Sequence, residues 1–144
     1  DPAIYAVGEC VQHRGELFGL VAPLFEQAKV CANHLAELGI AIYVRKPTAT
    51  QLKITGINVY SAGDFMGQEG CEYLHYHDAA LGHYKRLVVR DGKLIGAVLY
   101  GDTQDGPWYF ELINQQLPVA AMRDTLIFGK HYCISDSLPF AKAA

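Results

Sequence analysis

The spacing of apolar residues over the first forty positions predicts a short strand followed by a long helix. The apolar run 4–7 ends at Gly8-Glu9, which is typical of a buried parallel strand that leads into a loop. From Pro23, apolar side chains recur every three or four residues and predict an amphipathic helix that ends at Gly39. A second apolar run follows at 40–44. The apolar stripe of the helix consists of Leu24, Phe25, Ala28, Cys31 and Leu35.

Between residues 50 and 129 the pattern predicts an antiparallel sheet. The alternation over 52–59 slips by one position at Thr55-Gly56, which indicates a bulge or a tight bend. Asp91-Gly92 is typical of a two-residue hairpin turn. The run 94–99 lacks polar alternation, so we expect it inside the central strand, buried on both faces. After this segment three strands are expected, at 73–78, 84–90 and 93–100, in a sheet of about four or five strands. Two helices are expected after them, at 107–117 and 119–128.

These elements predict an α+β fold in three parts. Residues 1–45 contain a strand and a helix but too little sheet to form a core. Residues 50–129 contain a sheet with helices on one face. Residues 130–144 have the character of a peripheral tail. The sequence also does not begin with Met. We therefore expect a fragment of a longer protein.

Composition excludes several classes of protein. The chain has 144 residues, 51% of them hydrophobic, which is enough for a sizeable core. Its 12 basic and 15 acidic residues give a net charge of −3, whereas nucleic-acid binding requires a concentrated basic surface. No apolar stretch is long enough to cross a membrane. The 4 cysteines are far apart and contain no C-x-x-C pair, so we expect reduced thiols in a cytoplasmic protein.

Two short segments have the chemistry of a cofactor site. Glu9, at the end of the predicted strand, could accept a hydrogen bond from a sugar-like hydroxyl. The segment 18–23 leads into a helix N-terminus, where unpaired N–H groups favour a group that gains negative charge, such as the pyrimidine edge of a reduced flavin. An ordinary acid at the end of a strand and an ordinary helix start explain the same residues equally well.

A resemblance decides between these interpretations. Residues 1–10 and 19–28 resemble the last FAD-contacting stretch of the pyridine nucleotide-disulfide reductase superfamily and, more narrowly, the large subunits of assimilatory NAD(P)H-dependent nitrite reductases. Three further segments, at 52–64, 84–89 and 96–103, are similar to the C-terminal region that these enzymes share with rubredoxin reductases. The resemblance covers residues 1–129.

The resemblance implies specific roles. Gly8 and Glu9 match the pair whose acid binds the ribityl or ribose hydroxyls of FAD, and Val21 and Ala22 match positions whose backbone faces the flavin ring. Residues 50–129 match the interface domain, which contributes to homodimer contacts. The parent enzyme would pass hydride from NAD(P)H to FAD, and then electrons to iron–sulfur and siroheme centres that reduce nitrite. No residue of this chain is expected to be catalytic.

The sequence also departs from a whole reductase of this kind. It contains no G-x-G-x-x-G loop to hold the FAD pyrophosphate, and its cysteines do not match siroheme or iron–sulfur ligands. We therefore expect the chain alone not to bind FAD tightly, and the apolar stripe of its helix to seek a partner. Two alternatives remain: a fragment of a rubredoxin or ferredoxin reductase, or an assembly module without a cofactor.

Two other groups of residues could carry chemistry. His75, His77 and His83 could bind a metal, although histidines two apart on a strand are more often solvent-exposed. Carboxylates in the glycine-rich segment 63–72 could perform acid–base chemistry, but a solvated loop is the preferred interpretation. These are Asp64, Glu69 and Glu72. The aromatic cluster 108–110 is expected in the core.

Overall fold

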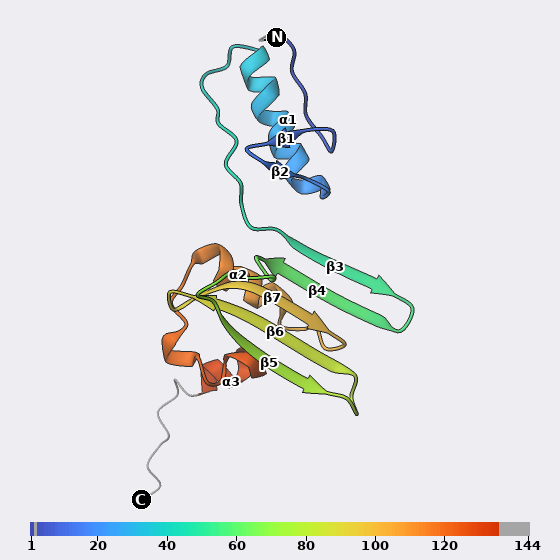
Figure 1. Ribbon diagram of the computed structural model, residues 1–144, viewed down its shortest axis with the longest axis vertical. Coiled ribbons are helices and arrows are strands. Elements are labelled where there is room, and N and C mark those ends of the chain that lie inside the picture. Colours follow the sequence, from blue (N-terminus) through green and yellow to red (C-terminus); the bar gives the residue numbers. More distant parts are fainter. Residues whose placement is uncertain (2, 136–144) are drawn as a thin grey trace, which may run out of the picture. The chain divides into compact units, whose positions relative to one another are not determined.

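The computed structural model describes residue 1 and residues 3–135 of the chain (Figure 1). The chain divides into two compact units, with the division after Lys46. The first unit contains β1 (Gln12–His13), β2 (Glu16–Leu17) and α1 (Val21–Leu35). The second contains a five-stranded sheet and all the other helices.

The hairpin β1–β2 was not predicted from the sequence. Its two-residue turn is Arg14-Gly15, and both residues have a positive φ, 52° and 86°. Such a turn usually has Asn or Asp before the glycine, so Arg14-Gly15 did not indicate a hairpin turn. The ring of Tyr43 packs edge-on against Phe18 and His13 and ties the hairpin to the end of the unit.

The expected strand at 4–7 is not formed, and neither is a strand at 40–44. Both segments are extended, with Ile4 and Ile40 exposed, the latter to 97%. A strand exists only when a neighbouring strand accepts its backbone hydrogen bonds, and the described part of the first unit provides none for either segment.

The helix α1 confirms the predicted amphipathic helix but is shifted toward the N-terminus. It begins at Val21, two residues before Pro23, and ends at Leu35. The left-handed residue that terminates it is Glu37, with φ of 55°, rather than Gly39. The predicted stripe is only partly covered, since Phe25 remains 65% exposed.

The second unit is built on one antiparallel sheet in the order β3-β4-β7-β6-β5. Its strands are β3 (Ala49–Ile54), β4 (Ile57–Gly63), β5 (Glu72–Asp78), β6 (His83–Arg90) and β7 (Lys93–Tyr100). The central position of β7 confirms the prediction that 94–99 lies in the central strand, but the predicted burial on both faces is wrong, because Val98 on the second face is only half-buried. The phase slip at Thr55-Gly56 is a complete two-residue turn that pairs Ile54 with Ile57, so the predicted bulge or tight bend is the turn of a hairpin. The predicted turn at Asp91-Gly92 is also present.

Helices cover one face of this sheet (Figure 1). The helix α2 (Gly106–Gln115) packs on β7 and β4, as predicted. The expected helix at 119–128 is instead two 3₁₀ turns, η1 (Ala120–Met122) and η2 (Leu126–Phe128). The hydroxyl of Thr125 donates to the Met122 carbonyl between them and competes with helical pairing. The helix α3 (Lys130–Ser135) occupies the start of the expected tail, and residues 136–144 lie outside the described residues.

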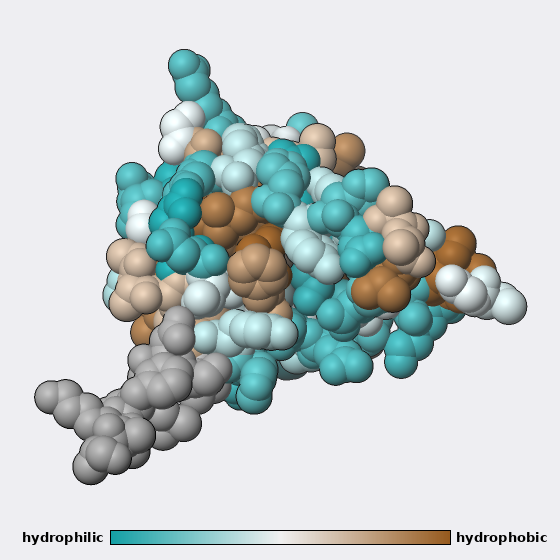
Figure 2. All heavy atoms as spheres, turned by 90° about the horizontal axis from the view of Figure 1, so that it is seen from below, coloured by the Kyte–Doolittle hydropathy of each residue, from teal (hydrophilic) through white to brown (hydrophobic). Residues whose placement is uncertain are grey.

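The core lies between the sheet and these helices. It contains buried side chains from β4, β6, β7, α2 and the η1–η2 segment, among them Tyr60, Leu87, Leu99, Tyr109, Leu112 and Leu126. On the surface, hydrophobic residues show in separate patches between hydrophilic side chains (Figure 2). None of the helices in the described ranges combines the length and the apolarity that crossing a bilayer requires.

The second face of the sheet, which we call the open face, is covered by none of the described helices of the second unit (Figure 1). One end of it is covered by the loop 64–71. The N–H of Asp64 donates to the Ile95 carbonyl at 2.8 Å, and the backbone of this loop approaches Gly96 so closely that a Cβ there would collide with it. Gly96 therefore allows the loop to lie flat on β7.

Candidate functional site

The N-terminus of α1 has three backbone N–H groups for which the described residues provide no acceptor. They belong to Leu20, Val21 and Ala22, and the next residue, Pro23, has no N–H. Leu20, at the N-cap position, has no side-chain oxygen that could cap the helix. Val21 is 63% exposed, so a ligand can approach these donors. This end of the helix is therefore suited to an oxygen atom that carries negative charge.

The turn at Gly8-Glu9 provides the second half of the predicted site. Gly8 has φ of 109°, a conformation that favours glycine, and its carbonyl accepts from the N–H of Val11 at 3.1 Å. Glu9 is exposed and makes no hydrogen bond or ion pair with the described residues. No hydrogen bond of the described residues joins this turn to Val21 or Ala22. A ligand shared by the two segments stays a prediction.

A buried amide in the same helix was missed by the sequence reasoning. Gln27 is one of the two buried side chains among the described residues of the first unit, and none of the described residues bonds to its Nε2. The feature of the sequence that could have pointed to Gln27 is that it is a polar residue within an amphipathic helix. The free N–H groups of α1 suit a group that takes up negative charge, and the exposed carboxylate of Glu9 suits a hydroxyl, so each of the two segments is by itself compatible with part of FAD. Nothing in the described residues fits its pyrophosphate.

The three histidines do not form a metal site. His75 and His77 lie on the open face, where His75 Nδ1 is 3.3 Å from the hydroxyl of Tyr84. His83 alternates with Tyr84 and therefore projects to the helix-covered face. Across residues 3–135, no three His, Cys, Asp or Glu side chains are grouped to hold a metal ion.

The three carboxylates of the glycine-rich segment have separate roles. Asp64 accepts the backbone N–H of Gly67 at 3.1 Å and shapes the loop. Glu72 forms an ion pair with Arg123, beside a cavity of about 290 Å³. Glu69 is exposed. The structure therefore does not bring them together for acid–base chemistry.

A buried lysine is the main polar feature of the second unit that the sequence did not reveal. Lys85 on β6 is only 5% exposed, and its Nζ lies 2.9 Å from Asp102 and 3.9 Å from Asp105. The hydrogen bond from Lys85 holds the pKa of Asp102 below its usual value. Asp105 also accepts the backbone N–H of Lys130 at 3.1 Å. This network ties the sheet to the starts of α2 and α3.

The aromatic cluster 108–110 lies in or against the core, as predicted. Tyr109 is fully buried, and its hydroxyl donates to the Leu126 carbonyl at 2.7 Å. Burial raises the pKa of Tyr109 far above its ordinary value. The cluster is therefore structural.

Comparison with known proteins identifies the relatives of this chain. A family model for the rubredoxin NAD+ reductase C-terminal domain matches residues 48–117. Nitrite reductase [NAD(P)H] of Bacillus subtilis (strain 168) is 44% identical over 119 residues, which are 83% of this chain and 15% of that protein. The assimilatory nitrate reductase electron transfer subunit of the same organism is 37% identical over 88% of this chain and 16% of its own length. The nitrite reductase (NADH) large subunit of Escherichia coli (strain K12) is 37% identical over 91% and 16%.

A solved structure supports the same assignment at the level of the fold. NADH:rubredoxin oxidoreductase from Clostridium acetobutylicum superposes with a TM-score of 0.59 over 92% of this chain and 33% of that chain, at 18% identity. The chain thus spans only about one sixth of the length of these curated relatives. The α+β prediction and the resemblance are both confirmed. Over most of its length the chain is similar to part of these nitrite reductases, and its residues 48–117 match the rubredoxin NAD+ reductase C-terminal domain.

Proposed function

We propose that this chain is part of the flavoprotein region of an NAD(P)H-dependent nitrite reductase. In that role residues 1–46 contribute one edge of the FAD site, and residues 47–135 form the interface domain. The observation that carries the proposal is the set of three unpaired N–H groups at the start of α1, in a segment matching relatives with this activity. Siroheme and iron–sulfur centres belong to other parts of such an enzyme.

The residues of the chain have distinct tasks in this proposal. The N–H groups of Val21 and Ala22 bind the pyrimidine edge of the flavin, and the positive end of the α1 dipole stabilises negative charge there. Glu9 accepts a hydrogen bond from a ribityl or ribose hydroxyl, and Gly8 gives the backbone the turn that presents Glu9. FAD, when bound, supplies the hydride and electron chemistry.

The remainder of the reductase polypeptide is the first partner we propose, and a second copy of the enzyme is the other. The apolar stripe of α1 supports the first partner, because Phe25 and Leu35 are largely exposed. We also propose the cytoplasm as the compartment, where separate thiols such as Cys10, Cys31 and Cys71 stay reduced.

A second candidate function is a reductase that passes electrons to a separate carrier protein. The match to a rubredoxin reductase domain over residues 48–117 favours it. The two candidates differ in the final acceptor. A polypeptide extended to the full length of the relatives should consume NAD(P)H with nitrite under the first proposal, and only with an added carrier protein under the second.

The flavin role of the first unit is tested with Glu9→Gln in that extended polypeptide. Loss of a charge-assisted hydrogen bond should weaken FAD binding about tenfold, equivalent to about 1.4 kcal/mol. Glu37→Gln is the matched control, because Glu37 is exposed in the same unit and has no predicted role. Equal FAD affinities for the two variants would exclude the role of Glu9. A colourless extended polypeptide would favour a module without a cofactor.

A further inference from the structure

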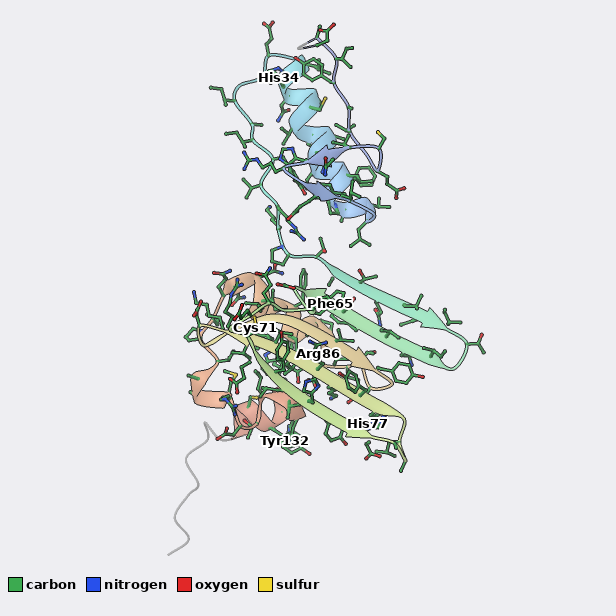
Figure 3. The ribbon with its side chains drawn as sticks, viewed as in Figure 1. His34, Phe65, Cys71, His77, Arg86 and Tyr132 are labelled. Atoms are coloured by element: carbon green, nitrogen blue, oxygen red, sulfur yellow. The ribbon has the colours of Figure 1, made fainter. Side chains whose placement is uncertain are left out.

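Arg86 lies near the middle of the open face (Figure 3). On β6 it stands between His75 of β5 and Val98 of β7. Its guanidinium lies 4.8 Å over the ring of Tyr73, and its Nη2 donates to the Met66 carbonyl at 3.1 Å. Its Nε is buried and has no hydrogen-bond partner in the part of the chain that the structure describes. The side chain is therefore held in place while most of its five N–H groups remain unused.

No carboxylate balances the charge of Arg86 among the described residues. Arg45 and Arg123 form ion pairs, whereas Arg14 and Arg90 are unpaired but exposed to water. Arg86 is the one arginine of the described chain that is both partly buried and without a carboxylate partner. A cation in this position is costly unless an anion accompanies it.

The composition of the open face leads to the same conclusion. Register and alternation assign to it three residues from each of β3, β5 and β6 and the alternate residues of β4 and β7. None of these positions is Asp or Glu, and the ring of Tyr73 lies against the guanidinium. These open-face residues are Thr50, Leu52, Ile54, Ile57, Val59, Ser61, Gly63, Tyr73, His75, His77, Tyr84, Arg86, Val88, Gly96, Val98 and Tyr100.

We propose that Arg86 is the anchor of an oxyanion-binding site on the open face, separate from the flavin edge. Its ligand is a carboxylate or a phosphate, because a planar guanidinium binds both through paired N–H groups. Stacking on Tyr73 fixes the guanidinium in advance, so little side-chain entropy is lost on binding. His75, directly across the strand pair, adds a second polar group at the rim of the site.

The test uses ¹⁵N NMR of the arginine Nε–Hε groups in the 144-residue chain. Sodium phosphate and sodium acetate are titrated separately at constant ionic strength, so that general screening is the same throughout. The Arg86 signal should shift several-fold more than those of Arg14 and Arg90 and should reach saturation. A larger response to phosphate identifies a phosphoryl ligand, and a larger response to acetate identifies a carboxylate. An Arg86 signal that moves no more than the two exposed arginines overturns the proposal.

A substitution provides a second test. Arg86→Lys keeps the positive charge but loses the paired geometry, and it should weaken the anion response of neighbouring His75 at least about fivefold, equivalent to about 1 kcal/mol. Arg90→Lys, at the exposed end of the same strand, should leave that response unchanged. Equal responses in the two variants would count against the site. The titration of the unmodified chain decides the question even if a variant folds poorly.

Discussion

Replacing Asp102 by Asn tests whether the buried Lys85 network holds the second unit together. Lys85 is almost completely buried, and Asp102 is its closest counter-charge, at 2.9 Å. Asp102→Asn preserves the size of the side chain but leaves the lysine with Asp105 alone, at 3.9 Å. The second unit should therefore lose stability even though no apolar contact is removed.

The expected loss follows from the geometry. Two unit charges at this separation attract by about 4–6 kcal/mol at an effective dielectric constant of about 20. Breaking a buried pair by removing one partner typically costs about 3–5 kcal/mol. The side chain of Asp102 is 30% exposed, so water already screens part of the attraction. We therefore expect about 2–3 kcal/mol, which corresponds to about 10–20 °C in Tm for a unit of this size.

Urea unfolding, followed by the fluorescence of Trp108, measures this loss. Trp108 is the only tryptophan of the chain and packs against the core of the second unit. Asp124→Asn is the matched control, because Asp124 is 93% exposed and pairs only with the exposed Arg123; it should change stability by less than about 0.5 kcal/mol. A loss below about 0.5 kcal/mol for Asp102→Asn would refute the reasoning.

The same variant has a defined pH dependence. The folded pKa of Asp102 is lowered, so its contribution to stability is complete above the pKa of the unfolded chain, about 3.9. The contribution is lost as the pH falls from there through the lower folded pKa. The difference between the original chain and Asp102→Asn should therefore be constant near neutral pH and shrink only below about pH 4.

Three further perturbations test other parts of the structure. Tyr109→Phe leaves the Leu126 carbonyl with the N–H of Gly129 as its remaining donor, and urea unfolding should show a loss of about 1 kcal/mol. Gly96→Ala places a Cβ against the Asp64 backbone, so the same assay should show a loss of about 1–3 kcal/mol, with increased hydrogen exchange in the loop 64–71. Phe25→Ser removes exposed apolar surface from α1 and should reduce concentration-dependent self-association of the isolated chain, measured by light scattering.

The sheet was predictable because its signals are local. Asp91-Gly92 dictates a tight turn, and the uninterrupted apolar run 94–99 lies in β7, the central strand of the sheet. The helix α2 follows from Pro107 near its start and from its apolar spacing. In each case the local sequence determines the element, and tertiary contacts add stability to it.

The features that were predicted wrongly or missed depend on contacts with distant residues rather than on local sequence. The run 4–7 has the composition of a strand, but a strand needs a neighbour, and the described residues supply none. A lysine such as Lys85 is expected to face solvent. Only the fold shows that Asp102 and Asp105, which follow β7, lie beside it. No spacing rule connects a strand lysine with acids that follow so much later in the chain.

The candidate site was predictable in type but not in detail. The start of α1 at Val21 could be placed near Pro23, and the absence of a capping side chain at Leu20 was visible in the sequence. The roles of Gly8 and Glu9 came from the resemblance alone. Gln27 was missed because an isolated polar residue on an amphipathic helix usually faces water, whereas here the first unit buries it.

The most direct test of the central proposal is Val21→Pro in a polypeptide that carries the rest of the FAD domain. Proline is well tolerated at the first position of a helix, and Leu20 already has the extended conformation, φ −113° and ψ 139°, that a residue before proline adopts. The variant therefore removes one N–H donor and leaves α1 intact, with Val21→Ala as the control. Our account predicts FAD binding about tenfold weaker and a lower flavin reduction potential for the proline variant alone. Unchanged affinity and potential, with unchanged helix content by circular dichroism, would contradict it.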